Sequence, residues 1–113
     1  MIRQARYEEK TNVQGGAGTV RFYHIVEADE LYGHGRLYAK IVVPPGASIG
    51  WHVHHGETEP YFILSGEGLF TDSDGSVHRV TAGDSCLIEP EHGHSIANEG
   101  PEDLVFIALI HKA

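Results

Sequence analysis

The stretch GASIGWHVHHGETEPYFILSG, residues 46–66, points to both a fold and a chemistry. Within eight residues it holds three histidines and two glutamates, and strand-like segments lie on both sides of it. Side chains two positions apart on a strand point to the same face of a sheet. His52 and His54 can therefore reach one ion together, and Glu59 follows closely enough to add a carboxylate oxygen. The stretch predicts a metal site between strands.

The length and charge of the chain narrow the classes of protein that it can be. With 113 residues, of which 41% are hydrophobic, residues 1–113 are expected to form a single domain with one core. The formal net charge is −8, from 16 acidic and 8 basic residues. Nucleic acid and anionic membranes are bound through clustered lysine and arginine, so neither partner is expected. A small anionic ligand is compatible with this charge, because a bound cation reverses the local potential.

The sequence carries no sign of export or of a membrane span. Cys86 is the only cysteine, so no disulfide can form within the chain, and we expect it to be a small packed residue rather than a nucleophile. The first ten residues lack the apolar region of a signal peptide. The longest apolar run, Leu104–Ile110, is too short to span a bilayer. A cytoplasmic location is expected.

Short strand candidates recur along the chain with turn signals between them, and no long helical period is present. Asp74-Gly75 is a strong hairpin signal, and Glu27–Leu31 can form one helical turn. Residues 1–11 read as an arm or a first edge strand. This pattern predicts an all-β sandwich or barrel. The expected strands are Val20–Val26, Arg36–Val43, Tyr61–Leu64, Leu69–Thr71, Val77–Val80, Ser85–Ile88, His92–Asn98 and Leu104–Ile110.

The strand Arg36–Val43 has two faces of different character. Leu37, Ala39, Ile41 and Val43 alternate onto one face, which is apolar. The other face carries polar groups that are either solvated or, in a barrel, turned toward a pocket. In the second case they can bind an anionic ligand. The polar side chains are Arg36, Tyr38 and Lys40.

A second group of histidines follows at residues 92–98. On a strand, His92 and His94 would share a face with Ile96 and Asn98. One of the two histidines can complete the site begun by the first group. Three neutral imidazoles and one carboxylate suit Mn, Fe(II), Co or Ni in an octahedron with two open positions, whereas zinc prefers four ligands.

The first stretch resembles the first motif of the cupin superfamily, G-x5-H-x-H-x(3,4)-E-x6-G. The chain matches it without a gap from Gly46 through His52, His54 and Glu59 to Gly66.

The second cupin motif, G-x5-P-x-G-x2-H-x3-N, is matched over residues 83–98, at Gly83, His94 and Asn98. Glu89 stands where the family has proline, and Glu91 where it has glycine. The turn before His94 is therefore expected to differ in shape, while the ligand spacing is kept.

The resemblance implies an antiparallel double-stranded β-helix, that is, a jelly-roll barrel. It also implies a divalent metal, with Mn or Fe(II) favoured and Ni, Co or Zn as alternatives. His55 and His92 have no counterpart among the family's ligands, and Glu57 is an alternative ligand at the wrong spacing. Small members usually form homodimers in which the partner covers the edge strands. The implied ligands are His52, His54, Glu59 and His94.

The chain also resembles small bacterial cupins described as oxalate-decarboxylase-like or mannose-6-phosphate-isomerase-like, and those labels fix no reaction. Our first hypothesis is a metalloenzyme, a decarboxylase, dioxygenase or isomerase, that acts on a small carboxylate, keto or hydroxy acid, or sugar. The alternative is a non-catalytic module that binds such a ligand through the metal. Strand parity alone gives four candidates for proton transfer: Tyr38, Tyr61, His92 and Glu57.

Overall fold

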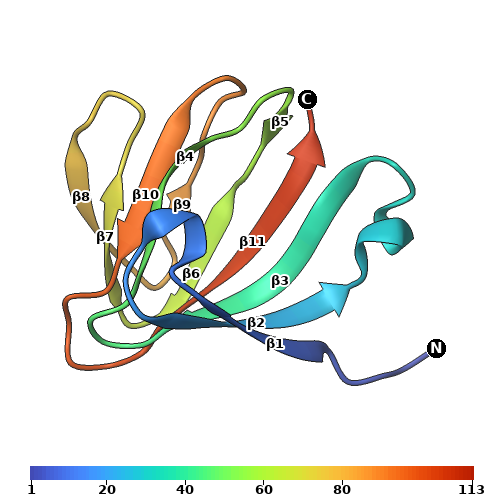
Figure 1. Cartoon of the computed structure of the whole chain (residues 1–113), viewed down its shortest axis with the longest axis horizontal. Helices are drawn as coiled ribbons and strands as arrows, with labels where there is room; N and C mark the ends of the chain where they lie inside the picture. Colours follow the sequence, from blue (N-terminus) through green and yellow to red (C-terminus); the bar gives the residue numbers. More distant parts are fainter.

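The computed structural model describes all residues, 1–113, and consists of two antiparallel sheets that face each other (Figure 1). The seven-stranded sheet runs in the order β1 (Arg6–Thr11), β2 (Thr19–Val26), β3 (Gly35–Val43), β11 (Leu104–Lys112), β6 (Tyr61–Ser65) and β9 (Ser85–Cys86), with β5 (Glu57–Thr58) also paired to β11. The four-stranded sheet runs β4 (Ser48–Val53), β10 (Gly93–Ala97), β7 (Glu67–Thr71) and β8 (Val77–Thr81).

Several neighbouring strands, such as β3 with β11 and β4 with β10, come from distant parts of the chain, which is consistent with a jelly-roll double-stranded β-helix. The predicted all-β fold class is confirmed. Two short 3₁₀ turns, η1 (Val13–Gly15) and η2 (Ala28–Leu31), complete the structure, and η2 is the helical turn that the sequence predicts. Neither is long and apolar enough to cross a membrane.

The core lies between the two sheets and follows from alternation along the strands. On β3, Ala39, Ile41 and Val43 point inward and are almost fully buried, as predicted. The closing strand β11 alternates in the same way, with Leu104 and Phe106 completely buried. Its other face is half-buried rather than enclosed. The apolar run in β11 therefore marks a strand with one buried face, and the outer face keeps apolar side chains as well.

Most of the predicted strands form with ends shifted by one or two residues, and two of these shifts bear on the argument. β9 ends at Cys86, two residues before the predicted end at Ile88, and Ile88 is buried outside any ladder. β10 begins at Gly93, so His92 lies in the turn before the strand. Alternation cannot place His92 on the same face as His94, and the shared face that parity predicts does not form.

Gly66, which ends the first motif, sits at a point where no side chain fits. Its φ angle is +79°, and a Cβ there would lie 2.2 Å from the carbonyl oxygen of Asp103. Only glycine combines this left-handed conformation with such a close approach. Gly66 thus fixes the turn between β6 and β7 against the segment that leads into β11.

Asn98, the last residue of the second motif, ties three segments together. Its side chain is buried, and its amide nitrogen donates to the carbonyl oxygens of Val43 at 2.8 Å and Glu102 at 2.7 Å. Its side-chain oxygen accepts from the backbone N–H of Gly100 at 2.9 Å. The asparagine of the motif therefore holds neighbouring segments together and is not one of the metal-type ligands.

Candidate metal centre

The pairing of β4 with β10 brings the two histidine groups together. His52 and His94 are direct cross-strand partners, so both rings lie on the same face of the four-stranded sheet, the face that points toward the other sheet. His54 follows the end of β4 and is held by two backbone hydrogen bonds. Its N–H donates to the carbonyl of His92 at 3.2 Å, and its own carbonyl accepts from the N–H of Glu91 at 2.7 Å.

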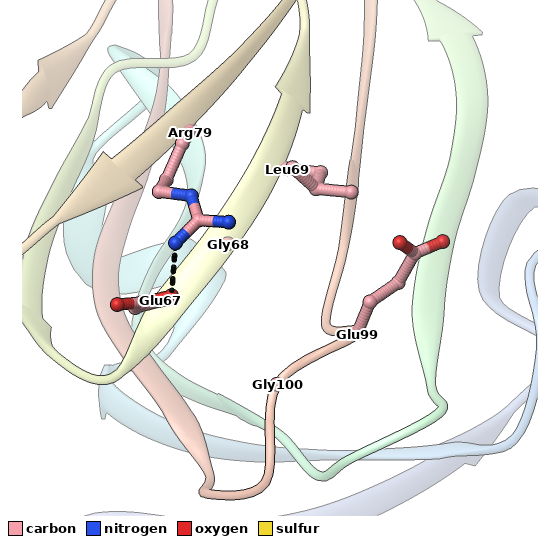
Figure 2. A pocket seen from close by; sticks show the side chains of 6 residues that line it. All are labelled: Glu67, Gly68, Leu69, Arg79, Glu99 and Gly100. Atoms are coloured by element: carbon pink, nitrogen blue, oxygen red, sulfur yellow. Dashed lines mark hydrogen bonds and ion pairs between the residues drawn. The ribbon is translucent and has the colours of Figure 1, made fainter.

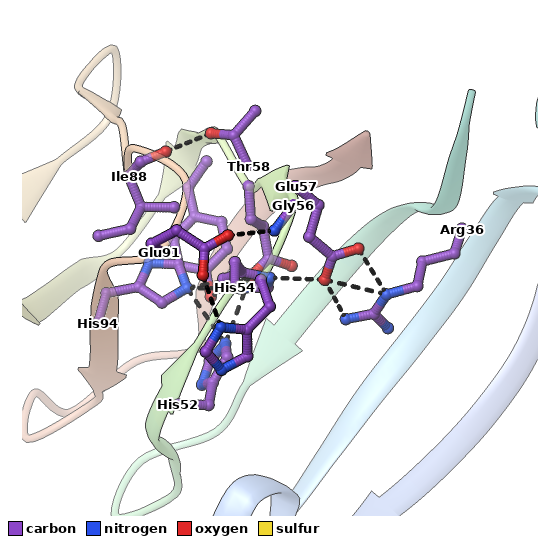
Figure 3. Close-up of polar contacts among 12 residues, drawn as sticks. Arg36, His52, His54, Gly56, Glu57, Thr58, Ile88, Glu91 and His94 are labelled. Atoms are coloured by element: carbon purple, nitrogen blue, oxygen red, sulfur yellow. Dashed lines mark hydrogen bonds and ion pairs between the residues drawn. The ribbon is translucent and has the colours of Figure 1, made fainter. Parts of the chain in front are cut away.

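Glu59 reaches the same point from the seven-stranded sheet, between β5 and β6. One ligand atom from each of the four residues lies within 4.8 Å of all the others. The Nε2 atom of His94 is 3.1 Å from the Nε2 atoms of both His52 and His54 (Figure 3). The Oε1 atom of Glu59 lies 3.0 Å from Nε2 of His54 and 3.1 Å from Nε2 of His94. The expected four residues are thus brought together.

In His52 and His54, the hydrogen bond made by Nδ1, the ring nitrogen that points away from the site, shows that Nε2 points into the site with a free lone pair. Nδ1 of His52 donates to the carbonyl of Gly50 at 2.8 Å, and Nδ1 of His54 donates to the carboxylate of Glu57 at 3.0 Å. In the neutral ring, Nε2 of each is then a bare acceptor. Acceptor atoms that converge at about 3 Å repel one another unless a cation lies among them, and the donor set therefore fits a divalent metal ion.

The electrostatics of the site favour a positive charge. Burial by itself would raise the pKa of Glu59, but its contacts with His52, His54 and His94 outweigh this and hold the pKa well below its usual range. The carboxyl group is therefore ionised. The same carboxylate raises the pKa of His54, whereas burial lowers the pKa of His94. A buried anion among ring nitrogens is a setting in which a cation is stabilised.

Glu57, named from the sequence as an alternative metal ligand, points its carboxylate away from the other ligand atoms. The Nε–H of Arg36 donates to both oxygens of the Glu57 carboxylate, at 3.0 and 3.2 Å, and Nη2 of Arg36 donates to one of them at 2.8 Å (Figure 3). These bonds keep the pKa of Glu57 below its usual range. Its remaining contact is the outer nitrogen of His54. Glu57 thus orients a histidine from behind, and it lies outside the group of four.

Tyr61 lies beneath the site rather than free within it. Its side chain is buried, its hydroxyl donates to Oε1 of Glu59 at 3.2 Å, and its ring stacks on His94 with centroids 5.1 Å apart. Burial raises the pKa of the hydroxyl well above its usual value. Tyr61 therefore supports two of the four residues from different segments.

Glu91, which stands where the cupin motif has glycine, adopts a backbone conformation that is unusual for a residue with a side chain. Glu91 has a φ angle of 69°, in the left-handed region that glycine favours. Its carboxylate accepts from the N–H of Gly56 at 2.6 Å and pairs with Nδ1 of His55 at 2.7 Å (Figure 3). These contacts offset the strain of about 1 kcal/mol. His55 lies on the exposed rim.

Gly93, immediately before His94, is buried under an aromatic side chain. A Cβ at this position would lie 2.4 Å from the indole of Trp51 on the neighbouring strand β4. Trp51 can rest against the backbone of β10 only because residue 93 has no side chain. The outer face of the sheet behind His94 is thereby covered.

A small pocket of about 100 Å³ opens beside the site and is lined by three of the four residues, with His94 outside the lining. His52, His54, Glu59 and Tyr61 form its floor. Tyr38, Lys40 and His92, named from the sequence, are not among its lining residues. Most of the other lining residues are apolar, and the two basic ones come from β1 and β3 of the seven-stranded sheet. These remaining lining residues are Lys10, Val13, Gln14, Phe22, Arg36, Leu37, Ile41, Ile49 and Ile110.

Lys10 is the pocket residue that sequence reasoning missed, because β1 was read only as an arm or edge strand. Its inward direction follows from the register of β1 against β2, which no local pattern reveals.

A separate hollow lies between β7, β8 and the turn after Asn98 (Figure 2). Its one basic side chain, Arg79, is already paired with Glu67 at 3.0 Å, and it holds no group of metal-type ligands.

The fold and the site define a class, namely small jelly-roll barrels with a histidine-rich centre between two sheets. Residues 39–110 match the family model described as Cupin domain. The chain belongs to this family.

Relatives from Thermotoga maritima are similar over most of the chain. A protein named oxalate-binding protein is 42% identical over 103 residues, which are 91% of this chain and 84% of that protein. A crystal structure described as a predicted oxalate decarboxylase has a TM-score of 0.91 and 39% identity, over 96% of this chain and 94% of that one. A double-stranded β-helix protein of Klebsiella pneumoniae, with a TM-score of 0.70 and 24% identity over 80% of this chain and 75% of that one, is similar in fold.

Proposed function

We propose that this cupin binds a divalent transition metal ion through His52, His54, Glu59 and His94. The observation that carries the proposal is the convergence of three ring nitrogens and one ionised carboxylate, buried and facing one another at about 3 Å. The mixed nitrogen and oxygen set favours Mn or Fe(II), with Ni, Co and Zn as alternatives.

The ligand that we propose for this centre is a small carboxylate or a similar oxygen-rich metabolite. A pocket of about 100 Å³ is well below the roughly 300–1,000 Å³ of sites for larger ligands. The relative from T. maritima is named for binding oxalate, which supports an acid of that size. A bound ion would act as a Lewis acid and template for such a ligand.

Between the two functions predicted from the sequence, the geometry favours binding over turnover. A catalytic acid or base must reach the ligand. Glu57 is held by Arg36 and His54, and the hydroxyl of Tyr61 is directed to Glu59. Tyr38 and His92 lie outside the pocket, so none of the four candidates is free within it. We therefore propose a metal-dependent carboxylate-binding protein.

The second candidate is the metalloenzyme of our first hypothesis. It is favoured by the similar structure described as a predicted oxalate decarboxylase. An assay of the metal-loaded protein with oxalate, under air and with each candidate metal, separates the two. Binding without release of CO₂ or formate supports the binding protein, and release of either product supports the enzyme.

The metal proposal is tested by metal analysis of the purified protein and by titration with Mn²⁺ or Ni²⁺. His52→Ala and His94→Ala should each abolish tight binding. His55→Ala should leave it unchanged, because His55 pairs with Glu91 on the rim. Loss of the metal in His55→Ala alone would mean that the ligands are wrongly assigned.

We further propose that the protein is a homodimer that pairs through the outer face of the seven-stranded sheet. Phe62 and Leu64 on β6 are 47% and 42% exposed, and Phe62 lies beside Ile107 of β11. Exposed apolar side chains grouped on a sheet face are typical of an association surface. Phe62→Glu should convert the dimer to a monomer in light scattering after size exclusion. Val77→Glu, on β8 of the other sheet, is the control.

A further inference from the structure

Strand β1 is an edge strand that carries three charged side chains on the face that it shares with the inward-facing residues of β2, and two of them, Arg6 and Lys10, are exposed. The register of β1 against β2 places Arg6, Glu8 and Lys10 opposite His24, Phe22 and Val20, which are the inward-facing residues of β2. Inward charges are one way in which proteins protect an edge strand from pairing with another chain. That explanation accounts for the presence of charge, but not for what each charge contacts.

The first two of these side chains are matched within the chain. Arg6 lies 3.0 Å from the carboxylate of Glu27, and Glu8 lies 2.8 Å from Nε2 of His24. Lys10 has no carboxylate within ion-pair distance. Its ammonium lies 5.0 Å from the ring centroid of Phe22, and both residues line the pocket beside the metal-type centre. Lys10 is therefore an unpaired cation at the mouth of that pocket.

The balance of charge around the pocket isolates Lys10 further. The guanidinium of Arg36 also lines the pocket, but Glu57 neutralises it through the hydrogen bonds described above. Glu59 offsets one of the two charges of a divalent ion. One positive charge then remains at the ion and a second at Lys10. A ligand with two negative charges matches this arrangement, whereas a singly charged acid leaves Lys10 unmatched.

We propose that Lys10 is a specificity-determining residue that makes the pocket prefer a small dianion over a monoanion of similar size. The inference rests on the proposed function, since it concerns the ligand of the same metal centre. The ion holds one part of the dianion, and the remaining negative charge lies toward the ammonium of Lys10. Lys10 changes the affinity of the pocket for ligands of different charge and leaves the affinity for the metal unchanged.

The experiment compares two acids on the metal-loaded full chain by titration calorimetry. Oxalate is the dianion, and glycolate is a chelating acid of similar size with one charge fewer. Lys10→Met removes the ammonium and keeps an apolar stem over Phe22. Lys40→Met is the matched control, because Lys40 also lies over an aromatic ring, 4.5 Å from the centroid of Tyr23, and does not line this pocket.

For Lys10→Met, the Kd for oxalate should rise about fivefold, the factor expected for one partly exposed ion pair. The Kd for glycolate should rise less than about twofold, and Lys10→Arg should restore oxalate binding. Added salt should weaken oxalate binding more steeply in the wild type than in Lys10→Met. Lys40→Met should behave as the wild type in all titrations.

Equal loss of both acids, unchanged oxalate binding in Lys10→Met, or weaker metal binding in that variant would overturn the role of Lys10. In each of these outcomes the wild type still binds carboxylate, and the proposed function stands. A wild type that holds the metal and binds neither acid overturns the proposed function together with this inference.

Discussion

Glu57 and Glu59 are two positions apart, and their carboxylates have different surroundings. Glu59 follows β5 and points at the three imidazoles, where it is almost fully buried. Glu57 lies within β5, beside the end of β11, and its carboxylate meets Arg36 and the outer nitrogen of His54. A carboxylate behind a metal-binding histidine fixes the tautomer and the direction of the ring. At the scale of single residues, Glu59 is the proposed metal ligand and Glu57 orients the ring of His54.

Glu57→Ala should weaken metal binding about 10- to 100-fold, because Nδ1 of His54 loses its acceptor and the ring loses its fixed direction. The Kd for Mn²⁺ or Ni²⁺, measured by competition with a chelating dye, checks this. Glu67→Ala is a suitable control, since Glu67 also pairs with an arginine but lies far from the site. An unchanged Kd in Glu57→Ala would show that His54 is positioned by the backbone alone.

Cys86 should be unreactive in the folded protein at neutral pH. Its side chain is buried, and burial raises the pKa of the thiol to about 11. Because the pKa is raised, the thiolate is scarce below this value and reaction should accelerate only as the pH approaches it. Reaction with a disulfide reagent, followed by absorbance at pH 8, should be slow in buffer and fast in denaturant. Rapid reaction of the native protein would contradict a packed role for Cys86.

At the scale of elements, the pairing of β4 with β10 is what joins the two sequence motifs. It places His52 opposite His94, and the bonds around Glu91 extend the contact beyond the end of β4. The other end of the same strand pair is held by Asn98. The site is therefore bounded by hydrogen bonds at both ends of one strand pair.

Asn98→Ala should destabilise the protein by about 2–4 kcal/mol, because it leaves two carbonyls and one N–H without their partner inside the protein. The free energy of unfolding in urea measures this. Glu99→Ala, at the exposed neighbouring position, should change it by less than about 0.5 kcal/mol. Equal stability of the two variants would mean that water replaces the bonds of Asn98.

Local spacing predicts the all-β fold and the grouping of His52, His54 and Glu59, whereas the choice of His94 over His92 comes from the resemblance to the second cupin motif. The motif glycines Gly46, Gly66 and Gly83 mark turns with positive φ angles, and at Gly66 the turn also leaves no room for a side chain. The contacts that could not be predicted are those set by pairing between distant strands. Arg36 meets Glu57 across the sheet, and Lys10 enters the pocket through the register of β1. Glu91 shows a further limit, because its hydrogen bonds compensate for a conformation that its residue type disfavours.

At the scale of the whole molecule, the four residues come from both sheets. His52 and His94 belong to the four-stranded sheet, whereas Glu59 joins two strands of the seven-stranded one. An ion held by all of them would cross-link the two layers on either side of the core. Metal binding and the stability of the barrel are therefore expected to be coupled.

Addition of Mn²⁺ or Ni²⁺ at about 100 times its Kd should stabilise the folded state by about 2.7 kcal/mol and raise Tm by about 10 °C. Thermal unfolding followed by circular dichroism checks this, with and without a chelator. His94→Ala should unfold at the same temperature in both conditions. If the Tm of the wild type did not change when the metal is added, binding by residues of both sheets would be contradicted.

The packing of Trp51 on Gly93 gives the protein a built-in optical reporter. Trp51 is the only tryptophan of the chain, so all indole emission originates beside the residue that precedes His94. An ion with partly filled d orbitals, bound by the histidines behind it, would quench this emission through short-range energy transfer. Occupancy of the centre could then be followed in real time, without a label, as the ion enters or leaves the barrel.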